Sequence, residues 1–267
     1  MNNKRRILVI TDCIDIASNE IRATLVRELE NMNASSDVVI EPIAFVKEFS
    51  IINANFIARL LAETYNPESL TILIIANSLN TATKKRARIA GVLTNGIKIV
   101  GANTGVFTWL IDDFGLAAIC ETSRDGLKGV GFISFGGKYI HAPIAAKFTV
   151  QNNIEAVKMA DFSQDDLVKV EYKNGTVLHI DNFGVIKFGT KSEVLNAKIG
   201  ERYKITVNGK GVGTATYCES MKELKDGELA LYKGSSLGLL EIGIVRHLET
   251  AKTLGIEIGD QIALTKE

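Results

Sequence analysis

Two stretches in the last third of the chain place residues that could do chemistry next to apolar strands. The first, His179 to Thr190, contains Asp181 at the end of a β-branched run. The second, Leu231 to Asp260, contains Ser235 and Ser236 just before another apolar run. A carboxylate and hydroxyls at such strand ends can meet a small ligand, because binding sites combine apolar walls with a few placed polar groups. The two stretches therefore predict a small-molecule site.

The elements that must position these residues change character along the chain. The first half alternates helical stripes, such as Ile21, Leu25 and Leu29, with short apolar runs rich in β-branched residues at 7–10, 38–40, 70–76 and 97–100. Strand and helix in alternation predict βαβ units and a mostly parallel sheet, whose strands are apolar throughout because both faces are buried. We therefore predict an α/β N-terminal domain over residues 1–150.

From about Asp165 the pattern becomes one of alternating strands separated by turns. Lys173-Asn174-Gly175 and Asn208-Gly209 are hairpin signals, because Asn-Gly readily takes the positive φ angles of a tight turn. We read Gly209 to Thr214, GKGVGT, as a turn too, since it lacks the ending of a phosphate loop. The sequence thus predicts a smaller, antiparallel, β-barrel-like domain over residues 165–267.

Bulk composition excludes several classes of function. The chain has 267 residues, with 31 basic and 31 acidic side chains. This balance argues against general binding to nucleic acid or to a membrane surface, and no apolar run approaches the ~20 residues of a spanning helix. Three scattered cysteines, Cys13, Cys120 and Cys218, are typical of buried thiols in a reducing compartment. We expect a cytoplasmic protein.

Asp12 ends the first apolar run and has two interpretations. In open parallel sheets ligands bind beyond the carboxyl ends of the strands, where this carboxylate could accept both hydroxyls of a ribose. Alternatively it caps the following helix, although Asp15 or Ser18 could equally do so. No G-x-G-x-x-G follows this run, so a dinucleotide-binding loop is not predicted.

The other candidates also have structural alternatives. Asp181 could be a turn residue, Ser235 and Ser236 a polar loop, and Phe183 part of the core. His141, His179 and His247 have no metal-ligand spacing, so no metal site is predicted and structural or surface roles are expected. His179 is the one histidine that could act as an acid or base, because it shares a strand face with Asp181.

Five motifs in order resemble the S-adenosylmethionine (SAM) hydroxide adenosyltransferases and the related SAM-dependent chlorinases and fluorinases. They are ITD ending at Asp12, GANTGVF from Gly101, SFGGKYIHAPIAA from Ser134, and the two stretches above. The family patterns are T-D-F-G, G-P-D-N-G-L-L, T-F-H-G-R-D-I-F-A-P-V-A-A, D-x-F-G-N and N-S-x-G-Y-L-E-I-A. The resemblance covers nearly the whole chain.

The resemblance implies a ligand, a set of binding residues and an assembly. Asp12 would hold the ribose, Phe183 would pack near adenine, and Asp181 and Ser236 would hold the amino and carboxylate ends of methionine. The full set of substrate-binding candidates is Asp12, Phe49, Asn103, Phe135, Asp181, Phe183, Ser235 and Ser236. The resemblance also implies a homotrimer with sites between subunits, SAM or an adenosine-like ligand as substrate, and no prosthetic group.

Departures from the family pattern affect the reaction more than the ligand. The hydrolases position water with an Asp, an Arg and a His, and these positions are Ala76, Thr83 and Gly136 here. Val185 replaces an adenine-binding Asn, and the halogenase residues do not match either. Lys84, in a basic run that otherwise reads as a solvated edge, could replace the lost Arg charge. Lys84 and His179 are therefore the catalytic candidates.

Three functions remain open at this stage. The chain could be an enzyme acting at C5′ of SAM, releasing methionine and an adenosine product. It could instead be a binding protein that kept the nucleoside pocket without turnover, or a different adenosyl-processing enzyme on the same scaffold. The sequence leans towards an enzyme, with a small adenosyl ligand as its partner in each case.

Overall fold

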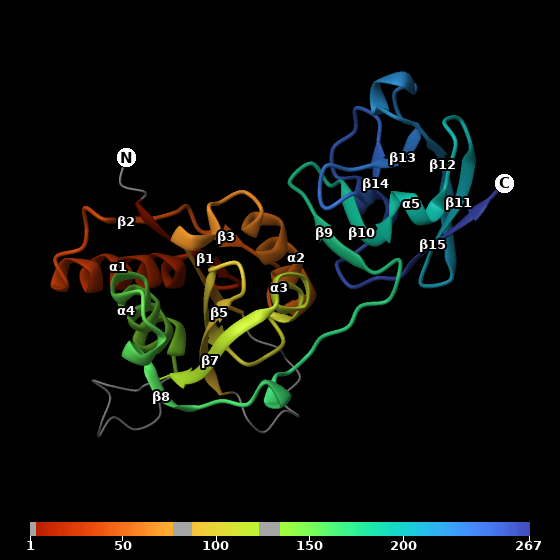
Figure 1. The fold of residues 1–267 in the computed structure, drawn as a ribbon. Helices are drawn as coiled ribbons and strands as arrows, with labels where there is room; N and C mark the ends of the chain where they lie inside the picture. The colour runs from red at the N-terminus through yellow and green to blue at the C-terminus, as the bar shows by residue number, and fades with distance from the viewer. Residues whose placement is uncertain (1–3, 77–86, 123–133) are drawn as a thin grey trace. The chain divides into compact units, whose positions relative to one another are not determined.

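The computed structural model describes residues 4–76, 87–122 and 134–267, and it divides into two compact units (Figure 1). Unit 1 comprises Met1–Val170 and unit 2 comprises Glu171–Glu267. The change in composition suggested an end at residue 150 and a start at 165. The structure puts the division later, because strand β8 (Lys158–Asp161) still pairs with the sheet of unit 1.

Unit 1 is built on a mixed sheet with the strand order β2-β1-β4-β6-β5-β7-β8, and β3 pairs with β1 beyond β2. Strands β1, β2, β3, β4 and β6 are parallel, as the βαβ pattern predicts. The strands are β1 (Arg5–Thr11), β2 (Val38–Ile40), β3 (Ala44–Phe45), β4 (Leu70–Ile75), β5 (Arg88–Leu93), β6 (Lys98–Ala102) and β7 (Leu116–Thr122), followed by β8.

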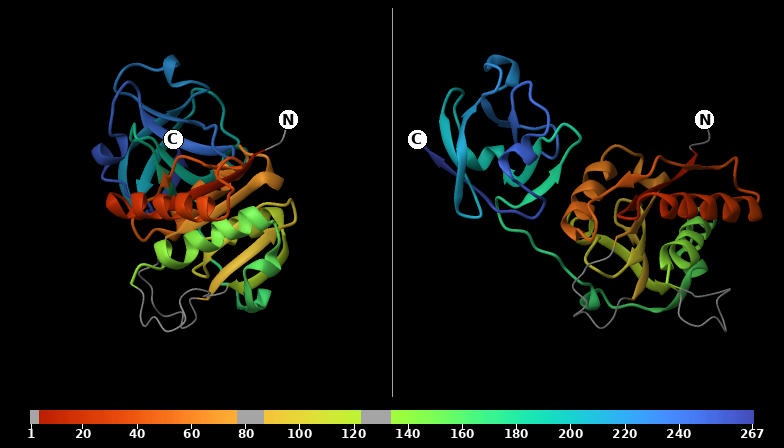
Figure 2. Two further views of the ribbon diagram at one scale, coloured as in Figure 1. Left: turned by 90° about the vertical axis from the view of Figure 1, so that its left-hand side faces the viewer. Right: turned by 180° about the vertical axis from the view of Figure 1, so that it is seen from behind.

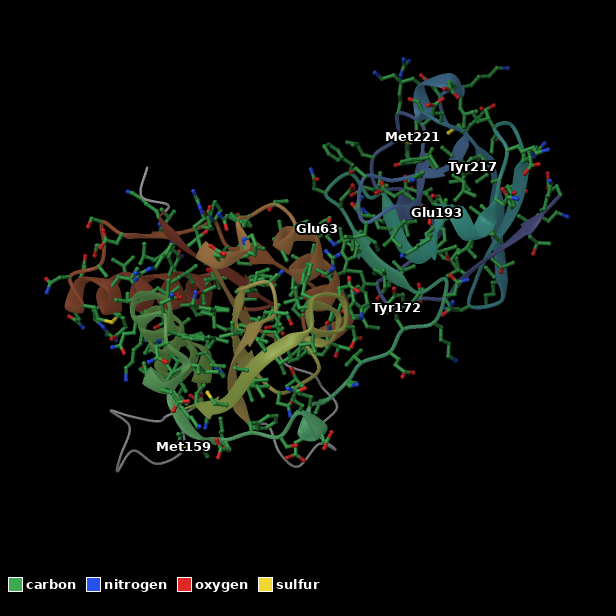
Figure 3. The ribbon with its side chains drawn as sticks, in the orientation of Figure 1. Glu63, Met159, Tyr172, Glu193, Tyr217 and Met221 are labelled. Carbon is green, nitrogen blue, oxygen red and sulfur yellow. The ribbon has the colours of Figure 1, made fainter. Side chains whose placement is uncertain are left out.

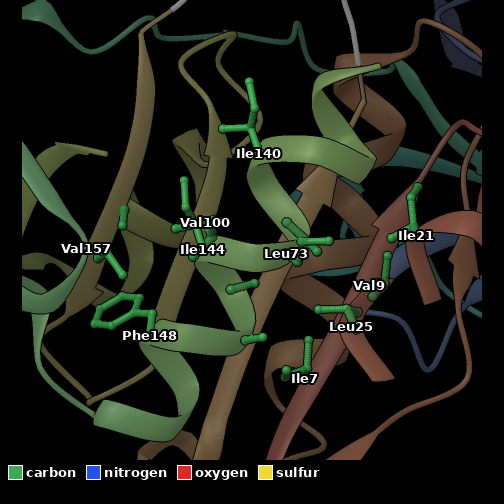
Figure 4. Packing of buried hydrophobic residues seen from close by; sticks show 14 of the residues in the cluster. Ile7, Val9, Ile21, Leu25, Leu73, Val100, Ile140, Ile144, Phe148 and Val157 are labelled. Atoms are coloured by element: carbon green, nitrogen blue, oxygen red, sulfur yellow. The ribbon is translucent and has the colours of Figure 1, made fainter. Parts of the chain in front are cut away.

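The sheet of unit 1 is buried on both faces. Along β1, Ile7 and Val9 join one buried cluster while Leu8 and Ile10 join another. The first cluster packs under α1 (Ile16–Asn31) and α4 (Ala142–Gln151), which lie side by side (Figures 2 and 4). The second packs under α2 (Ile51–Ala62) and α3 (Thr108–Phe114). Burial on both faces explains why the strand sequences are apolar throughout.

The antiparallel part of this sheet was not predicted. β5 runs antiparallel to both β6 and β7, and β8 runs antiparallel to β7. As a consequence, β7 ends at the same edge as β1, β4 and β6, while β5 begins there. No helix in the described part of the chain is long and apolar enough to cross a bilayer.

Unit 2 is a curled, mainly antiparallel sheet with the order β15-β11-β12-β13-β14-β10-β9, confirming the barrel-like expectation. An isolated bridge, Thr176 to Gln261, joins its two ends, and Val177 N donates to Asp260 O at 2.8 Å. The elements are β9 (Val177–Ile180), β10 (Ile186–Lys191), α5 (Ser192–Leu195), β11 (Arg202–Val207), β12 (Lys210–Tyr217), β13 (Leu229–Lys233), β14 (Leu239–Ile244), α6 (Thr250–Leu254) and β15 (Ile262–Lys266).

One of the two hairpin signals is confirmed. Asn208 and Gly209 both have positive φ, 49° and 82°, and connect β11 to β12. GKGVGT therefore begins at this turn but continues as strand β12, so reading all of it as a turn was wrong. The Asn174-Gly175 turn does not make a hairpin; it follows Tyr172 (Figure 3) and leads the chain into the barrel. A Cβ on Gly189 would lie 2.5 Å from Cε2 of the Tyr172 ring, so the ring packs on this glycine.

Candidate functional site

One edge of the unit 1 sheet gathers several of the predicted residues. The parallel strands β1, β4 and β6 end there, so Asp12, Ala76 and Asn103 follow three neighbouring strands. The main chain ties the first two strand ends together, because Asp12 N donates to Ile75 O at 3.2 Å. This is the edge at which open α/β sheets bind ligands.

Asp12 anchors a loop at this edge. Its Oδ2 accepts a hydrogen bond of 3.1 Å from the backbone N–H of Phe49. Phe49 has a φ of 58°, unusual for a residue with a side chain, and its ring is 50% exposed. The helix-cap alternative for Asp12 is wrong, since α1 starts after Asp15, which occupies the cap position without a side-chain bond. Asp12 thus presents a carboxylate beside an exposed aromatic ring.

Exposed apolar residues lie near Asp12 along the chain and on the neighbouring strand β3. Ile14 and Ile16 follow it closely and are 54% and 69% exposed. Phe45, the β3 partner of Thr11, is 50% exposed. Several large exposed apolar groups close to one carboxylate are typical of a surface that a ligand or a partner covers.

A helix start approaches the same edge through two glycines. A π-helical turn, η2 (Gly137–His141), precedes α4 without a break. A Cβ on Gly137 would lie 2.8 Å from Ile75 Cγ2 and 3.1 Å from Phe135 Cε2, so only glycine allows this approach to β4. Phe135 is partly buried against the core rather than open to solvent. Gly136 faces open space, so no side chain stands where the family has its His.

His141 is a residue that the sequence interpretation treated as structural. It ends the π-helical turn, is 8% exposed, and its Nδ1 has no hydrogen-bond partner among the described residues. Burial and the nearby Arg88 guanidinium lower the pKa of His141 to about 4, so the ring is neutral at pH 7. Arg88 begins β5 at the same edge, close enough for its charge to affect the pKa of His141.

Asn103 holds the segment that leads out of unit 1. Its Nδ2 donates to Asp166 O at 2.9 Å, and its Oδ1 accepts from Val168 N at 2.9 Å. The side chain is 3% exposed. Both ends of the amide are therefore engaged by backbone, and we assign Asn103 a structural role. Lys84 and Thr83 lie outside the described residues.

In unit 2, Asp181 organises the turn between β9 and β10. Its Oδ1 accepts 3.0 Å hydrogen bonds from the backbone N–H groups of Phe183 and Val185. The turn alternative is thus confirmed for Asp181. The turn directs Phe183 outward, where it is 57% exposed, so the core alternative for Phe183 is wrong. An exposed Phe held by a fixed turn can stack on a planar ligand.

A row of polar side chains crosses four neighbouring strands beside this turn. The register pairs His179 with Lys187, Lys187 with Glu241, and Glu241 with Tyr232. Lys187 and Glu241 are 9% and 6% exposed, although the row lies opposite the apolar core of the barrel. The sequence interpretation found only His179. Period-two alternation along β10, with Ile186 and Phe188 facing the core, was the signal for Lys187.

Burial and the charges of this row shift the pKa values of His179 and Tyr232. Burial, then the Lys187 ammonium, lower the pKa of His179 to about 4, so this imidazole is neutral at pH 7. Burial, then the Glu241 carboxylate, raise the pKa of the Tyr232 hydroxyl well above its usual range. At neutral pH His179 is therefore not in the acidic imidazolium form and is a weak base, which weakens its case as a catalytic acid or base.

The loop of Ser235 and Ser236 joins β13 to β14 next to the row. Ser235 is exposed, while Ser236 is buried, with 5% of its surface exposed. Gly234 packs directly on the Glu241 carboxylate; a Cβ there would come within 2.0 Å of Oε1. The loop, the turn and the polar row therefore form one continuous neighbourhood in unit 2.

Two other features of the described residues contribute no candidate. No group of three or more His, Cys, Asp or Glu side chains within them could hold a metal ion. A hollow of about 490 Å³ on unit 2 is lined by residues of β11 to β14 and α6, including Arg202, Thr214 and Leu254. It contains none of the predicted site residues.

Comparisons with known proteins give a matching family and a full-length relative. Residues 175–263 match the family described as SAM hydroxide adenosyltransferase C-terminal domain. Over 266 residues, the chain is 24% identical to the (R)-S-adenosyl-L-methionine hydrolase of Methanocaldococcus jannaschii, covering 96% of this chain and 95% of that protein.

Two solved structures share the fold. An uncharacterized conserved protein from Thermotoga maritima matches with a TM-score of 0.79 and 20% identity, over 97% of this chain and 100% of that one. A conserved hypothetical protein from Thermus thermophilus matches with a TM-score of 0.70 and 19% identity, over 98% and 100%. These two structures show the fold; the C-terminal match and the full-length relative support membership of this chain in the SAM hydroxide adenosyltransferase family.

Proposed function

We propose that this protein binds SAM or a related adenosyl compound, with the ribose hydroxyls on Asp12, and that it acts at C5′ of that ligand. The observation that carries the proposal is the full-length similarity to a protein named (R)-S-adenosyl-L-methionine hydrolase. Asp12 supports it, because this carboxylate stands at the ligand-binding edge of the sheet beside the exposed Phe49 ring. In unit 2, the exposed Phe183 and the buried Ser236 are residues that the family resemblance assigns to such a ligand.

The reaction would need alignment more than acid catalysis. A sulfonium leaving group departs without a proton, so the protein chiefly has to orient a nucleophile. Ala76 and Gly136 have no polar side-chain atom, so the family's way of positioning water is not available. His141 is the buried polar group at the same edge with an unpartnered ring nitrogen, and we propose it as a group that orients the nucleophile.

A second candidate function is ligand binding without turnover. It is favoured by Ala76, Thr83 and Gly136, which replace the Asp, Arg and His that position water in the hydrolases. One incubation with SAM, followed by chromatography of adenosine and methionine, separates the two. Product that disappears in His141→Phe would support the enzyme. Tight binding with no product would support the binding protein. Because the relative is named for the (R) epimer, both sulfonium epimers belong in the assay. The homotrimer stays a prediction.

Binding itself is tested by a matched pair of variants. Asp12→Asn keeps an acceptor for Phe49 N–H but loses the charge and one strong acceptor for a ribose hydroxyl. Hydrogen bonds to a charged group contribute about 1.5–3 kcal/mol, and about 1.4 kcal/mol is a factor of ten in affinity. We therefore expect adenosine affinity, measured by calorimetry, to fall about tenfold or more. Asp15→Asn, three residues away and exposed, is the control. Equal affinities for the two variants would refute the assignment.

A further inference from the structure

The ammonium group of Lys187 lies between two carboxylates in unit 2. Its Nζ is 3.0 Å from Asp181 Oδ2 and 3.3 Å from Glu241 Oε2. The side chains of Lys187 and Glu241 are 11% and 8% exposed, and that of Asp181 is 24% exposed. An ion pair so withdrawn from water is screened little by salt and holds its geometry, unlike a surface pair.

Strand register fixes the position of this lysine. Lys187 is the direct cross-strand partner of both His179 and Glu241, so its side chain rises from the middle of the polar row. Asp181 is held from the other side, because its Oδ1 is committed to the turn and its Oδ2 to the ammonium. The carboxylate of Glu241 is backed by Gly234. The three charged groups therefore form a prearranged set next to the Ser236 loop.

Asp181 and the Ser236 loop belong to the ligand site proposed above, and a pair of carboxylates there is suited to bind an amino group of the ligand. Here the protein supplies that ammonium itself. A tethered group competes at a high effective concentration and needs no external binding, so a ligand ammonium would have to displace Lys187 to reach the same oxygens. The contacts with Asp181 and Glu241, among the described residues, use two of the three N–H donors of Nζ. The third N–H can donate to the ligand.

We propose that Lys187 takes the place of a ligand ammonium in this site, so that the protein prefers adenosyl compounds whose 5′ substituent has no α-ammonium group. The inference rests on the proposed adenosyl-binding function and narrows its substrate class. Lys187 is then a specificity-determining residue. It lowers the binding affinity that an α-ammonium group on the ligand contributes, and it does not affect recognition of the nucleoside. A lysine that only stabilises the barrel would have no effect on this preference.

The test compares ligands that differ only in that group. S-adenosylhomocysteine and its desamino analogue are titrated calorimetrically into the wild-type protein, with adenosine and 5′-methylthioadenosine as nucleoside references. We expect the desamino analogue to bind at least as tightly as S-adenosylhomocysteine. Affinity for the desamino compound weaker by about tenfold or more would overturn the proposal, because it would show that the site uses the ammonium. This comparison decides the question without any variant.

Variants then assign the preference to Lys187. Lys187→Gln keeps donors towards both carboxylates but removes the internal charge, so the preference should shift towards S-adenosylhomocysteine by about tenfold or more. Lys191→Gln, an exposed lysine on the same strand, should leave the preference unchanged. Thermal melting confirms that each variant is folded, and an unchanged preference in folded Lys187→Gln would refute the role of this residue. If adenosine and 5′-methylthioadenosine do not bind the wild type, the proposed function fails as well; if they bind and the ammonium preference is opposite, only the present inference fails.

Discussion

Acid should destabilise unit 1 between pH 7 and pH 5 chiefly through one buried side chain, His141. The folded unit holds this ring neutral, with a pKa of about 4 against an ordinary value of 6.5, mainly because it is buried. At a pH between these two values, the His141 ring is protonated in the unfolded chain and neutral in the folded chain. The stabilisation is therefore complete above pH 6.5 and is lost as the pH falls towards 4.

The size of the effect follows from the two pKa values. A difference from 6.5 to about 4, at about 1.4 kcal/mol per unit, corresponds to at most about 3 kcal/mol. Between pH 7 and pH 5 the expected loss is about 2 kcal/mol, a large part of the stability of a typical domain. His179 should cause a loss in the same direction in unit 2, because its pKa is also lowered to about 4.

A spectroscopic probe separates the two histidines. The chain has one tryptophan, Trp109, and it lies on α3 of unit 1. Urea unfolding followed by Trp109 fluorescence should show the pH-dependent loss in the wild type and in the exposed-histidine control His247→Gln. His141→Phe should remove most of it, since a phenyl ring takes up no proton. An equal loss between pH 7 and pH 5 in His141→Phe would refute the reasoning.

Two further predictions concern the backbone. Asn103→Ala removes two hydrogen bonds to the 163–170 segment and should cost about 2 kcal/mol, at about 1 kcal/mol per bond; limited proteolysis should cut this segment faster than in the wild type, and an unchanged rate would argue against the clamp. Gly184→Ala should destabilise unit 2 strongly in urea unfolding followed by circular dichroism, because φ is 80° and the new Cβ would lie 2.6 Å from Glu249 Cα. Gly200→Ala is its control, with a φ of 87° but no atom within 4 Å, so similar losses would mean that conformation rather than contact decides.

Much of the fold could be predicted from local patterns. The runs at 7–10 and 70–76 are apolar at nearly every position, which indicates burial on both faces, and Asn208-Gly209 specifies a hairpin. Strand direction in the second half of unit 1 could not be predicted, because an apolar run such as 88–93 reads the same in a parallel or antiparallel pairing. The late end of unit 1 depends on the pairing of β8 with β7, a tertiary contact.

The candidate site was predicted less completely. Asp12 and Asp181 were found because each follows an apolar run, but their partners, Phe49 N–H and Lys187, are distant in sequence or hidden by register. Asn103 was predicted to bind the ligand, but its amide binds backbone. The residues around it in the sequence do not distinguish these two roles. The sequence could not reveal the burial of His141, because a histidine among apolar residues has no local sign of its protonation.

The bridge between Thr176 and Gln261 has a consequence for the order of folding. The two ends of the barrel sheet are 85 residues apart in sequence, so unit 2 cannot close until residues 259–262 have left the ribosome. Unit 1, complete by Val170, can form its core while that synthesis is still under way. Closure of so long a loop is slow compared with the formation of local hairpins, so the strands that carry the polar row depend on a slow step of folding. During that interval the strands of unit 2 have unpaired edges, which are open to wrong pairing with other chains.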